Sequence, residues 1–144
     1  MVSLEDEIKQ NGLKVTPQRS KILRYIRENS GKHFSAEDVH KHVVIDNPNI
    51  PPATVYNILK MFVDRGLINS FEINGKAIYE GRVEPHVNFS CENCKNIYDF
   101  DLEGDLSYLE KNVDGKVIST SVTVRGICRN CLNELEASEK ILAH

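Results

Sequence analysis

The chain has 144 residues, of which 40% are hydrophobic and 27% are charged, and its formal net charge is −3. This length fits one mid-sized domain or two small ones, and the sequence has no run of about 18 apolar residues that would cross a membrane. The N-terminal stretch MVSLEDEIKQNG is acidic and polar, unlike a secretory signal, so we expect a soluble cytoplasmic protein with no membrane partner.

The charges are distributed unevenly along the chain. Residues 1–82 carry 12 Lys and Arg against 10 Asp and Glu, whereas residues 83–144 carry 6 against 11. The first part can therefore approach phosphate groups, which repel the acidic second part. Glycine, proline and charged residues cluster in EGRVEP, residues 80–85. We therefore predict two domains, 1–82 and 83–144.

Capping residues predict three helices in the first domain. Thr16, followed by proline, is typical of a helix N-cap and predicts a helix over 17–29. Ser35, with Asp38 three residues later, resembles a capping box and opens a second helix. A third helix is predicted over 52–65, after the proline-containing loop IDNPNIPP.

The hydrophobic period then changes. Residues 67–80, LINSFEINGKAIYE, form two apolar runs around Asn74 and Gly75, which is the strongest short hairpin signal. Helices followed by a two-stranded hairpin predict a winged helix-turn-helix, and a generic small α+β domain is the alternative.

The second domain alternates strands and helices. Strands are predicted over 87–91 and 96–102, a short helix over 103–113, a strand over 116–128 and a C-terminal helix over 132–142. The order ββαβα predicts a small α/β module.

The helix over 52–65 has one apolar face at the spacing of a buried stripe. Its opposite face resembles that of a recognition helix in the major groove of DNA, with Ala53, Thr54, Tyr56, Asn57 and Lys60. We expect phosphates to be held by Lys60 together with Lys14, Arg19 and Lys76. An ordinary amphipathic helix with a solvated face is the alternative.

All four cysteines lie in the second domain, as two Cys-x-x-Cys pairs: Cys91 with Cys94, and Cys128 with Cys131. In a cytosolic chain, such pairs predict zinc before a disulfide. Four thiolates satisfy tetrahedral Zn2+, so we predict a closed structural site whose binding free energy helps to fold a small domain. The alternatives are free or disulfide-forming pairs, and a thioredoxin-like redox motif, which needs its cysteines at a helix start.

Five further side chains are candidate ligands for a second metal ion, and they come from both domains: His33, Glu80, His86, Asn88 and Asp99. Imidazole and carboxylate groups suit Fe2+, Mn2+ or a second Zn2+ better than copper. A site built from both domains would lock them in one relative orientation. Solvated side chains that bind no metal are the alternative.

Five segments together resemble the ferric uptake regulator (Fur) family: GLKVTPQRSKIL, HFSAEDVHKHV, PATVYNILKMFVDRGLI, HVNFSCENCKNIYDF and GICRNC. They look most similar to the peroxide-sensing PerR branch. The resemblance implies a homodimeric winged-helix repressor of AT-rich palindromic double-stranded DNA, with a structural zinc held by the four cysteines. It also implies a regulatory metal at His33, Glu80, His86 and Asp99, and a recognition motif that contains Tyr56 and Asn57.

The chain departs from the family pattern at Asn88, where members usually have a second histidine after the position of His86. An amide oxygen is a weaker and harder ligand than imidazole, so we expect a lower affinity and a preference for ions such as Mn2+. PerR-like members sense peroxide by iron-catalysed oxidation of ligand histidines, and Asp99 stands where that branch has an aspartate.

We therefore predict an α+β protein with an N-terminal winged helix-turn-helix for DNA binding, followed by a small α/β module for dimerisation and zinc binding. The predicted function is a metal-dependent transcriptional regulator, a repressor of metal homeostasis or peroxide-response genes, and not an enzyme. The alternatives are a DNA-binding regulator with structural zinc only, a cysteine–zinc thiol redox switch, and a thiol oxidoreductase.

Overall fold

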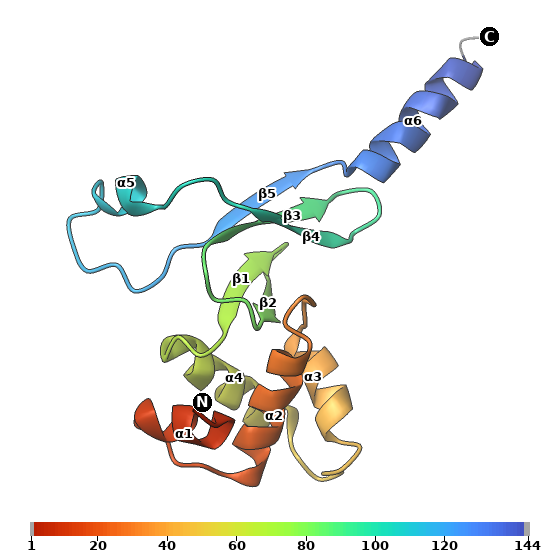
Figure 1. The fold of residues 1–144 in the computed structure, drawn as a ribbon. Coiled ribbons are helices and arrows are strands. Elements are labelled where there is room, and N and C mark those ends of the chain that lie inside the picture. Colours follow the sequence, from red (N-terminus) through yellow and green to blue (C-terminus); the bar gives the residue numbers. More distant parts are fainter. Residues whose placement is uncertain (1, 143–144) are drawn as a thin grey trace. The chain divides into compact units, whose positions relative to one another are not determined.

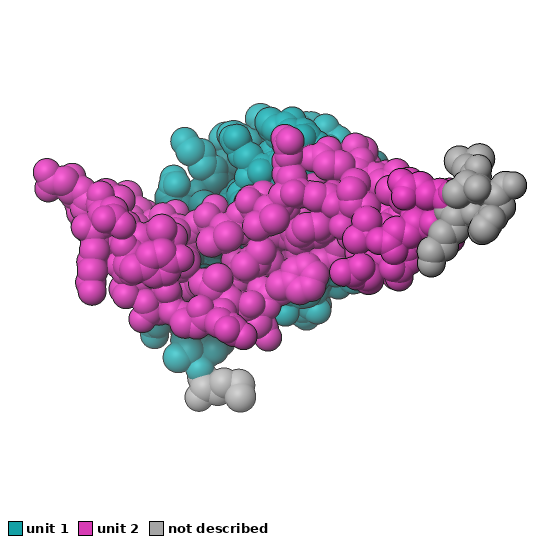
Figure 2. Space-filling view, turned by 90° about the horizontal axis from the view of Figure 1, so that it is seen from above, with its two compact units in different colours: residues 1–83 teal, residues 84–144 magenta. Residues whose placement is uncertain are grey.

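The computed structural model describes residues 2–142 (Figure 1). The chain forms two compact units, unit 1 over residues 1–83 and unit 2 over residues 84–144, which Figure 2 distinguishes by colour. Among the described residues, no helix is both long and apolar enough to cross a membrane. The element types confirm the predicted α+β class, with a helical unit and wing ahead of a small mixed module.

Unit 1 contains four helices: α1 (Leu4–Gln10), α2 (Pro17–Glu28), α3 (Ala36–Val43) and α4 (Pro52–Asp64). The predicted caps are confirmed. The Thr16 side chain accepts a hydrogen bond from the backbone N–H of Arg19 at the start of α2. Ser35 and Asp38 form a reciprocal capping box at the start of α3, which satisfies two backbone donors that a helix otherwise leaves open.

The wing is the hairpin of β1 (Asn69–Ile73) and β2 (Lys76–Glu80), which pair antiparallel. Its turn places Asn74 at φ 53° and Gly75 at φ 78°, the left-handed conformations that a two-residue turn of type I′ requires. This short turn fixes the register, so Asn69 lies opposite Glu80. The hairpin predicted from the Asn-Gly pair is confirmed.

The core of unit 1 is a cluster of aliphatic and aromatic side chains from all four helices and the wing. Buried members include Ile8, Ile22, Leu23, Ile26, Val39, Val55, Leu59, Phe62 and Tyr79. Burying side chains of this kind contributes on the order of 1.5–3 kcal/mol each. Because the apolar stripe of α4 packs into this core, its opposite face is left toward solvent.

Unit 2 is a three-stranded sheet in the order β4-β3-β5 with two helices. The elements are β3 (His86–Cys91), β4 (Ile97–Asp101), α5 (Ser107–Glu110), β5 (Val122–Gly126) and α6 (Arg129–Leu142). Strand β3 pairs antiparallel with β4 and parallel with β5.

The structure differs from the sequence-based boundaries in unit 2. The strand expected over 116–128 covers only Val122–Gly126, because β3 pairs with β5 no earlier than at Val87 opposite Val122. Residues before that point have no strand to pair with, and Ile118 is 85% exposed. The helix expected over 103–113 is a single turn, Ser107–Glu110, since Gly104 has a φ of 78° that no right-handed helix accepts.

The apolar cluster of unit 2 is small and contains sulfur. Its buried members are Cys91, Cys128 and Cys131, and Phe89 and Tyr98 pack against them. Such a cluster is too small to stabilise a domain of about 60 residues alone. A metal ion bound by the cysteines would supply the missing free energy.

We predict that Ser35→Ala lowers the free energy of unfolding of unit 1 by about 1 kcal/mol, because the Ser35 hydroxyl accepts the Asp38 N–H at 3.2 Å. Chemical denaturation followed by circular dichroism measures the change. The matched control is Ser30→Ala at an exposed serine, which should change stability by less than about 0.5 kcal/mol. Equal losses in the two variants would contradict the capping role.

Candidate metal centres and nucleic-acid interface

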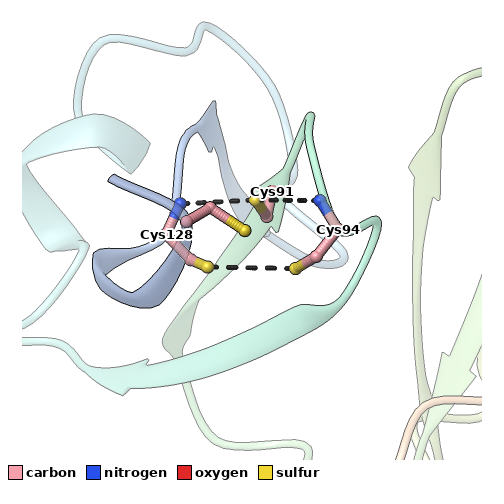
Figure 3. A group of neighbouring side chains, drawn as sticks. Cys91, Cys94 and Cys128 are labelled. Atoms are coloured by element: carbon pink, nitrogen blue, oxygen red, sulfur yellow. Dashed lines mark hydrogen bonds between the residues drawn. The ribbon is translucent and has the colours of Figure 1, made fainter. Parts of the chain in front are cut away.

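The four cysteines come from two junctions of unit 2, the β3–β4 turn and the start of α6. Cys91 ends β3, and Cys94 lies in a tight turn closed by Lys95 at φ 67°. Cys128 directly precedes α6, and Cys131 lies in its first turn. Figure 3 shows the side chains of Cys91, Cys94 and Cys128 turned toward one another. The predicted cysteine set is therefore brought together by the fold.

The geometry of the four sulfur atoms fits a tetrahedral zinc ion. All four lie within 4.8 Å of one another, and the Cys94 and Cys128 sulfurs are 3.8 Å apart. A tetrahedron with Zn–S bonds of about 2.3 Å has edges of about 3.8 Å, whereas a disulfide brings its sulfurs to about 2.05 Å. The cysteines are free thiols in the structure. Four thiol donors and no open position suit a closed structural zinc site.

Neighbouring groups lower the pKa of one cysteine and raise that of another. Burial raises the pKa of Cys91, but hydrogen bonds from the backbone N–H groups of Cys128, Cys94 and Asn93 outweigh burial and lower it to about 6. For Cys131 a contact with Asn93 lowers the pKa, but contacts with the other thiols and burial raise it to about 12. The cluster thus shares its protons among crowded sulfurs, and a bound cation would displace them.

The opposite face of β3 carries nitrogen and oxygen donors. Nδ1 of His86 lies 2.8 Å from the backbone oxygen of Glu84, so Nδ1 carries the proton and donates it. This tautomer directs Nε2 toward a metal ion, and metal-binding histidines usually donate the proton of their other ring nitrogen in this way. This Nε2 is 3.6 Å from Oδ1 of Asp99 on β4, and a cation between the two atoms would be attracted by both.

Asn88 lies on the same face of β3, opposite Asp99 in the register. It is 1% exposed, and neither amide atom has a hydrogen-bond partner among the described residues. A buried polar group left in this state costs about 1–3 kcal/mol. Its carbonyl oxygen is a suitable hard ligand, so Asn88 fits an ion site at this face.

Unit 1 carries a second histidine–carboxylate pair. Nε2 of His33 lies 3.2 Å from Oε2 of Glu80. The other carboxylate oxygen accepts a hydrogen bond of 2.8 Å from the Asn69 amide, which orients the group. The structure therefore joins His33 to Glu80 within unit 1, and His86 to Asp99 within unit 2.

The candidate DNA-binding residues of α4 face solvent. Ala53, Asn57 and Lys60 are exposed and Tyr56 is 49% exposed, whereas Thr54 is half-buried. The opposite stripe of the helix, which includes Val55, Ile58 and Leu59, is buried.

The other predicted phosphate-binding residues differ in the contacts that they already make within the protein. Lys14 is exposed, and its backbone oxygen accepts a 2.7 Å hydrogen bond from Arg19. Lys76 in the wing lies 3.9 Å from the Glu37 carboxylate, and both side chains are largely exposed. Such a surface pair is worth little, so it leaves Lys76 available to a phosphate.

Two site residues were missed from the sequence. Asn69 could have been found, because the Asn-Gly turn fixes the register that places it opposite Glu80. Tyr98, whose hydroxyl lies 3.7 Å from the Cys128 sulfur, comes from β4 and carries no spacing signal of its own. Its place beside the cysteines depends on the pairing of β3 with β4 and on the position of α6.

Comparison with known proteins decides the family. A sequence model described as the ferric uptake regulator family matches residues 10–124. The chain belongs to this family. It is 33% identical to the ferric uptake regulation protein of Bordetella parapertussis, over 90% of this chain and 97% of that one. It is also 33% identical to the peroxide operon regulator of Bacillus subtilis, over 88% of this chain and 89% of that one.

The fold agrees with solved structures of the family. The Vibrio cholerae ferric uptake regulator, whose structure has DNA-binding domains, aligns with a TM-score of 0.66 and 28% identity. The alignment covers 88% of this chain and 100% of that one. This Fur-family chain is therefore a metal-dependent transcriptional regulator with PerR-like relatives, as predicted.

We predict that removal of zinc unfolds unit 2, because its small cluster depends on the metal. A strong chelator should release one Zn2+ per chain and abolish the circular-dichroism signal of the sheet, and the four thiols should become reactive together. Adding Zn2+ should restore the fold, whereas adding Mg2+, which avoids thiolates, should not. A metal-free unit 2 that keeps its structure would contradict this dependence.

Proposed function

We propose that this Fur-family regulator is a homodimeric repressor that binds an AT-rich palindromic operator when a second metal ion is bound. The observation that carries the proposal is a histidine–carboxylate pair in each unit: His86 with Asp99 at 3.6 Å, and His33 with Glu80 at 3.2 Å. Imidazole nitrogen and carboxylate oxygen are ligands that Fe2+, Mn2+ and Zn2+ share.

We infer that one regulatory ion takes both pairs. An ion bound by residues of both units favours the arrangement in which all its ligands reach it, and this preference shifts the population of arrangements. If operator DNA binds that same arrangement, metal and DNA each raise the affinity of the other by the same factor. The structural zinc does not itself link the two units, since its ligands all lie in unit 2.

Asn88 makes the proposed site rich in oxygen. Its buried amide has no hydrogen-bond partner among the described residues, and the carbonyl oxygen supports coordination of a hard ion. An amide oxygen in place of imidazole weakens the preference for Zn2+ relative to Mn2+. Mn2+ or Fe2+ is therefore the regulatory ion that this donor set favours.

DNA recognition is proposed for the exposed face of α4. Asn57 can pair bidentately with adenine, and Tyr56 or Thr54 can contact the methyl group of thymine. Lys60, with Lys14 before α2, Arg19 in α2 and Lys76 in the wing, would hold phosphates. A two-fold dimer would place two such helices on the two halves of a palindrome.

The regulated response is metal homeostasis or peroxide defence, and the equal identity to the two relatives favours neither. Treating the iron-loaded protein with peroxide distinguishes the two responses. Oxygen added to His33 or His86, detected by mass spectrometry of peptides, would support a peroxide sensor. Unmodified histidines with intact metal-dependent DNA binding would support a metal sensor.

We predict that Mn2+ tightens operator binding by about 5–150-fold, the usual range of an allosteric coupling. Fluorescence anisotropy on an AT-rich palindromic duplex measures it, using zinc-loaded protein stripped of other metals at fixed salt. Asp99→Asn should abolish the effect of Mn2+, because the ion loses one of its two carboxylate ligands. The control Asp114→Asn, at an exposed aspartate, should respond as the parent does.

Two other results would count against a regulatory metal. Tight binding that is indifferent to Mn2+ would leave a DNA-binding protein with structural zinc only. Loss of DNA binding that tracks loss of zinc under mild peroxide would instead identify a thiol switch at the cysteines.

We predict that Lys60→Ala weakens binding equally on specific and unrelated duplexes, because an interaction with phosphate carries no sequence information. The slope of log affinity against log salt should fall by about 0.9 for each phosphate that the variant no longer neutralises. Anisotropy between low and moderate salt measures the slope. Lys111→Ala, at an exposed lysine of unit 2, is the control, and an equal change in slope for both variants would refute the α4 interface.

A further inference from the structure

The Tyr98 hydroxyl lies beside the zinc-binding sulfurs without being a ligand. Its oxygen is 3.7 Å from the sulfur of Cys128 and 3.9 Å from that of Cys94. Tyr98 stands on β4 opposite Phe89, so its ring lies on the face of the sheet that carries the cysteines. The four-cysteine site is complete without this hydroxyl, so its place there needs a separate explanation.

The hydrogen bonds around Tyr98 set the direction of its proton. The Asn96 amide donates to the Tyr98 oxygen at 3.5 Å, which occupies an acceptor position of that oxygen. A phenol is protonated at neutral pH, so the tyrosine has its own O–H left to donate. The sulfurs of Cys128 and Cys94 are the acceptors within reach.

The other donors to the cluster are mainly backbone N–H groups, and they reach the buried sulfurs. Cys91 is fully buried and accepts the backbone N–H groups of Cys94 at 3.4 Å and of Cys128 at 3.3 Å. Cys94, in contrast, is exposed. The Cys128 sulfur also accepts a hydrogen bond from the backbone N–H of Cys131. Backbone donors thus reach the buried sulfurs of Cys91 and Cys128, and Tyr98 adds a side-chain donor on the side where Cys94 is exposed.

A hollow of about 370 Å³ in unit 2 leads to the same side. Its apolar lining comes from Phe89, Phe100, Ile127 and Leu132, and its polar lining from Tyr98, Cys128, Arg129 and Asn130. Most of the exposed wall is apolar, so a small neutral molecule can enter the hollow without losing strong hydration. The Cys128 sulfur is therefore within reach of a neutral oxidant such as a peroxide, and Tyr98 lines the approach.

We propose that Tyr98 is a positioning residue that donates a hydrogen bond to the zinc thiolates of Cys128 and Cys94 and so slows their oxidation and the release of zinc. The proposal rests on the four-cysteine zinc site and is independent of the regulatory metal. The hydrogen bond from Tyr98 would determine how fast the structural zinc site is oxidised when the protein is exposed to peroxide.

The chemistry that Tyr98 restrains is nucleophilic attack by sulfur. A thiolate lone pair attacks one peroxide oxygen, an S–O bond forms and the O–O bond breaks, which gives a sulfenic acid. The hydroxide that leaves is protonated by the buffer. Sulfur is oxidised by two electrons and the peroxide is reduced. A second thiolate then attacks the sulfenic sulfur, a disulfide forms, hydroxide leaves and zinc loses two ligands. A hydrogen bond to the sulfur lone pair withdraws electron density and slows the first step.

Tyr98→Phe tests the proposal, because it removes the hydroxyl and keeps the ring. Zinc-loaded full-length protein is treated with hydrogen peroxide, and zinc release is followed with a chromogenic zinc indicator while remaining thiols are titrated. We expect release to be faster by about fivefold, the effect of one hydrogen bond of about 1 kcal/mol. Tyr108→Phe, at a tyrosine that is 61% exposed, is the matched control and should release zinc at the parent rate.

A spectroscopic readout separates this role from a merely structural one. Co2+ in place of zinc gives sulfur-to-metal charge-transfer bands, which should move to lower energy in Tyr98→Phe because the sulfurs become more electron-rich. Asn96→Ala, which frees the Tyr98 hydroxyl from its orienting donor, should shift the rate in the same direction by less. Unchanged rates and bands in Tyr98→Phe would overturn the proposal, as would an equal acceleration of zinc release in Tyr108→Phe. If Tyr98→Phe does not fold, an Asn96→Ala variant that keeps the parent rate and bands overturns it.

Discussion

The period-two alternation of β3 is the constraint on which the metal chemistry of unit 2 depends. Successive side chains of a strand point to opposite faces, so His86 and Asn88 lie on one face and Cys91 on the other. Pairing with β4 adds Asp99 to the first face and Tyr98 to the second. A shift of register by one residue would exchange the faces and disrupt both donor sets together.

The structural zinc supports the proposed regulatory site without contacting it. Zinc bound by the four cysteines ties the β3–β4 turn to the start of α6, and so holds the register in which His86 and Asp99 approach to 3.6 Å. The free energy of metal binding replaces the large apolar core that unit 2 lacks. Because zinc holds the strands in register, the second ion is not needed for folding. Its weaker nitrogen and oxygen ligands can therefore bind or release it as its concentration changes.

Features set by local chemistry were predictable from the sequence, and features set by distant partners were not. The caps at Thr16 and Ser35 and the Asn-Gly turn depend on a few adjacent residues, and all three are confirmed. The two Cys-x-x-Cys pairs were also recognisable from the sequence, because this spacing is common in structural zinc sites. The strand expected over 116–128 was too long, since pattern alone does not show where its partner begins. The role of Tyr98 was invisible for the same reason: only tertiary pairing brings it to the sulfurs.

The central claim is that this regulator holds two metal ions with separate donor sets, sulfur for one and nitrogen with oxygen for the other. X-ray absorption at the zinc and cobalt edges, on zinc-loaded protein that has received one equivalent of Co2+, tests it directly. The account predicts four sulfur neighbours at about 2.3 Å around zinc and only nitrogen and oxygen neighbours around cobalt. Sulfur around cobalt, or cobalt that stays unbound in solution, would contradict it.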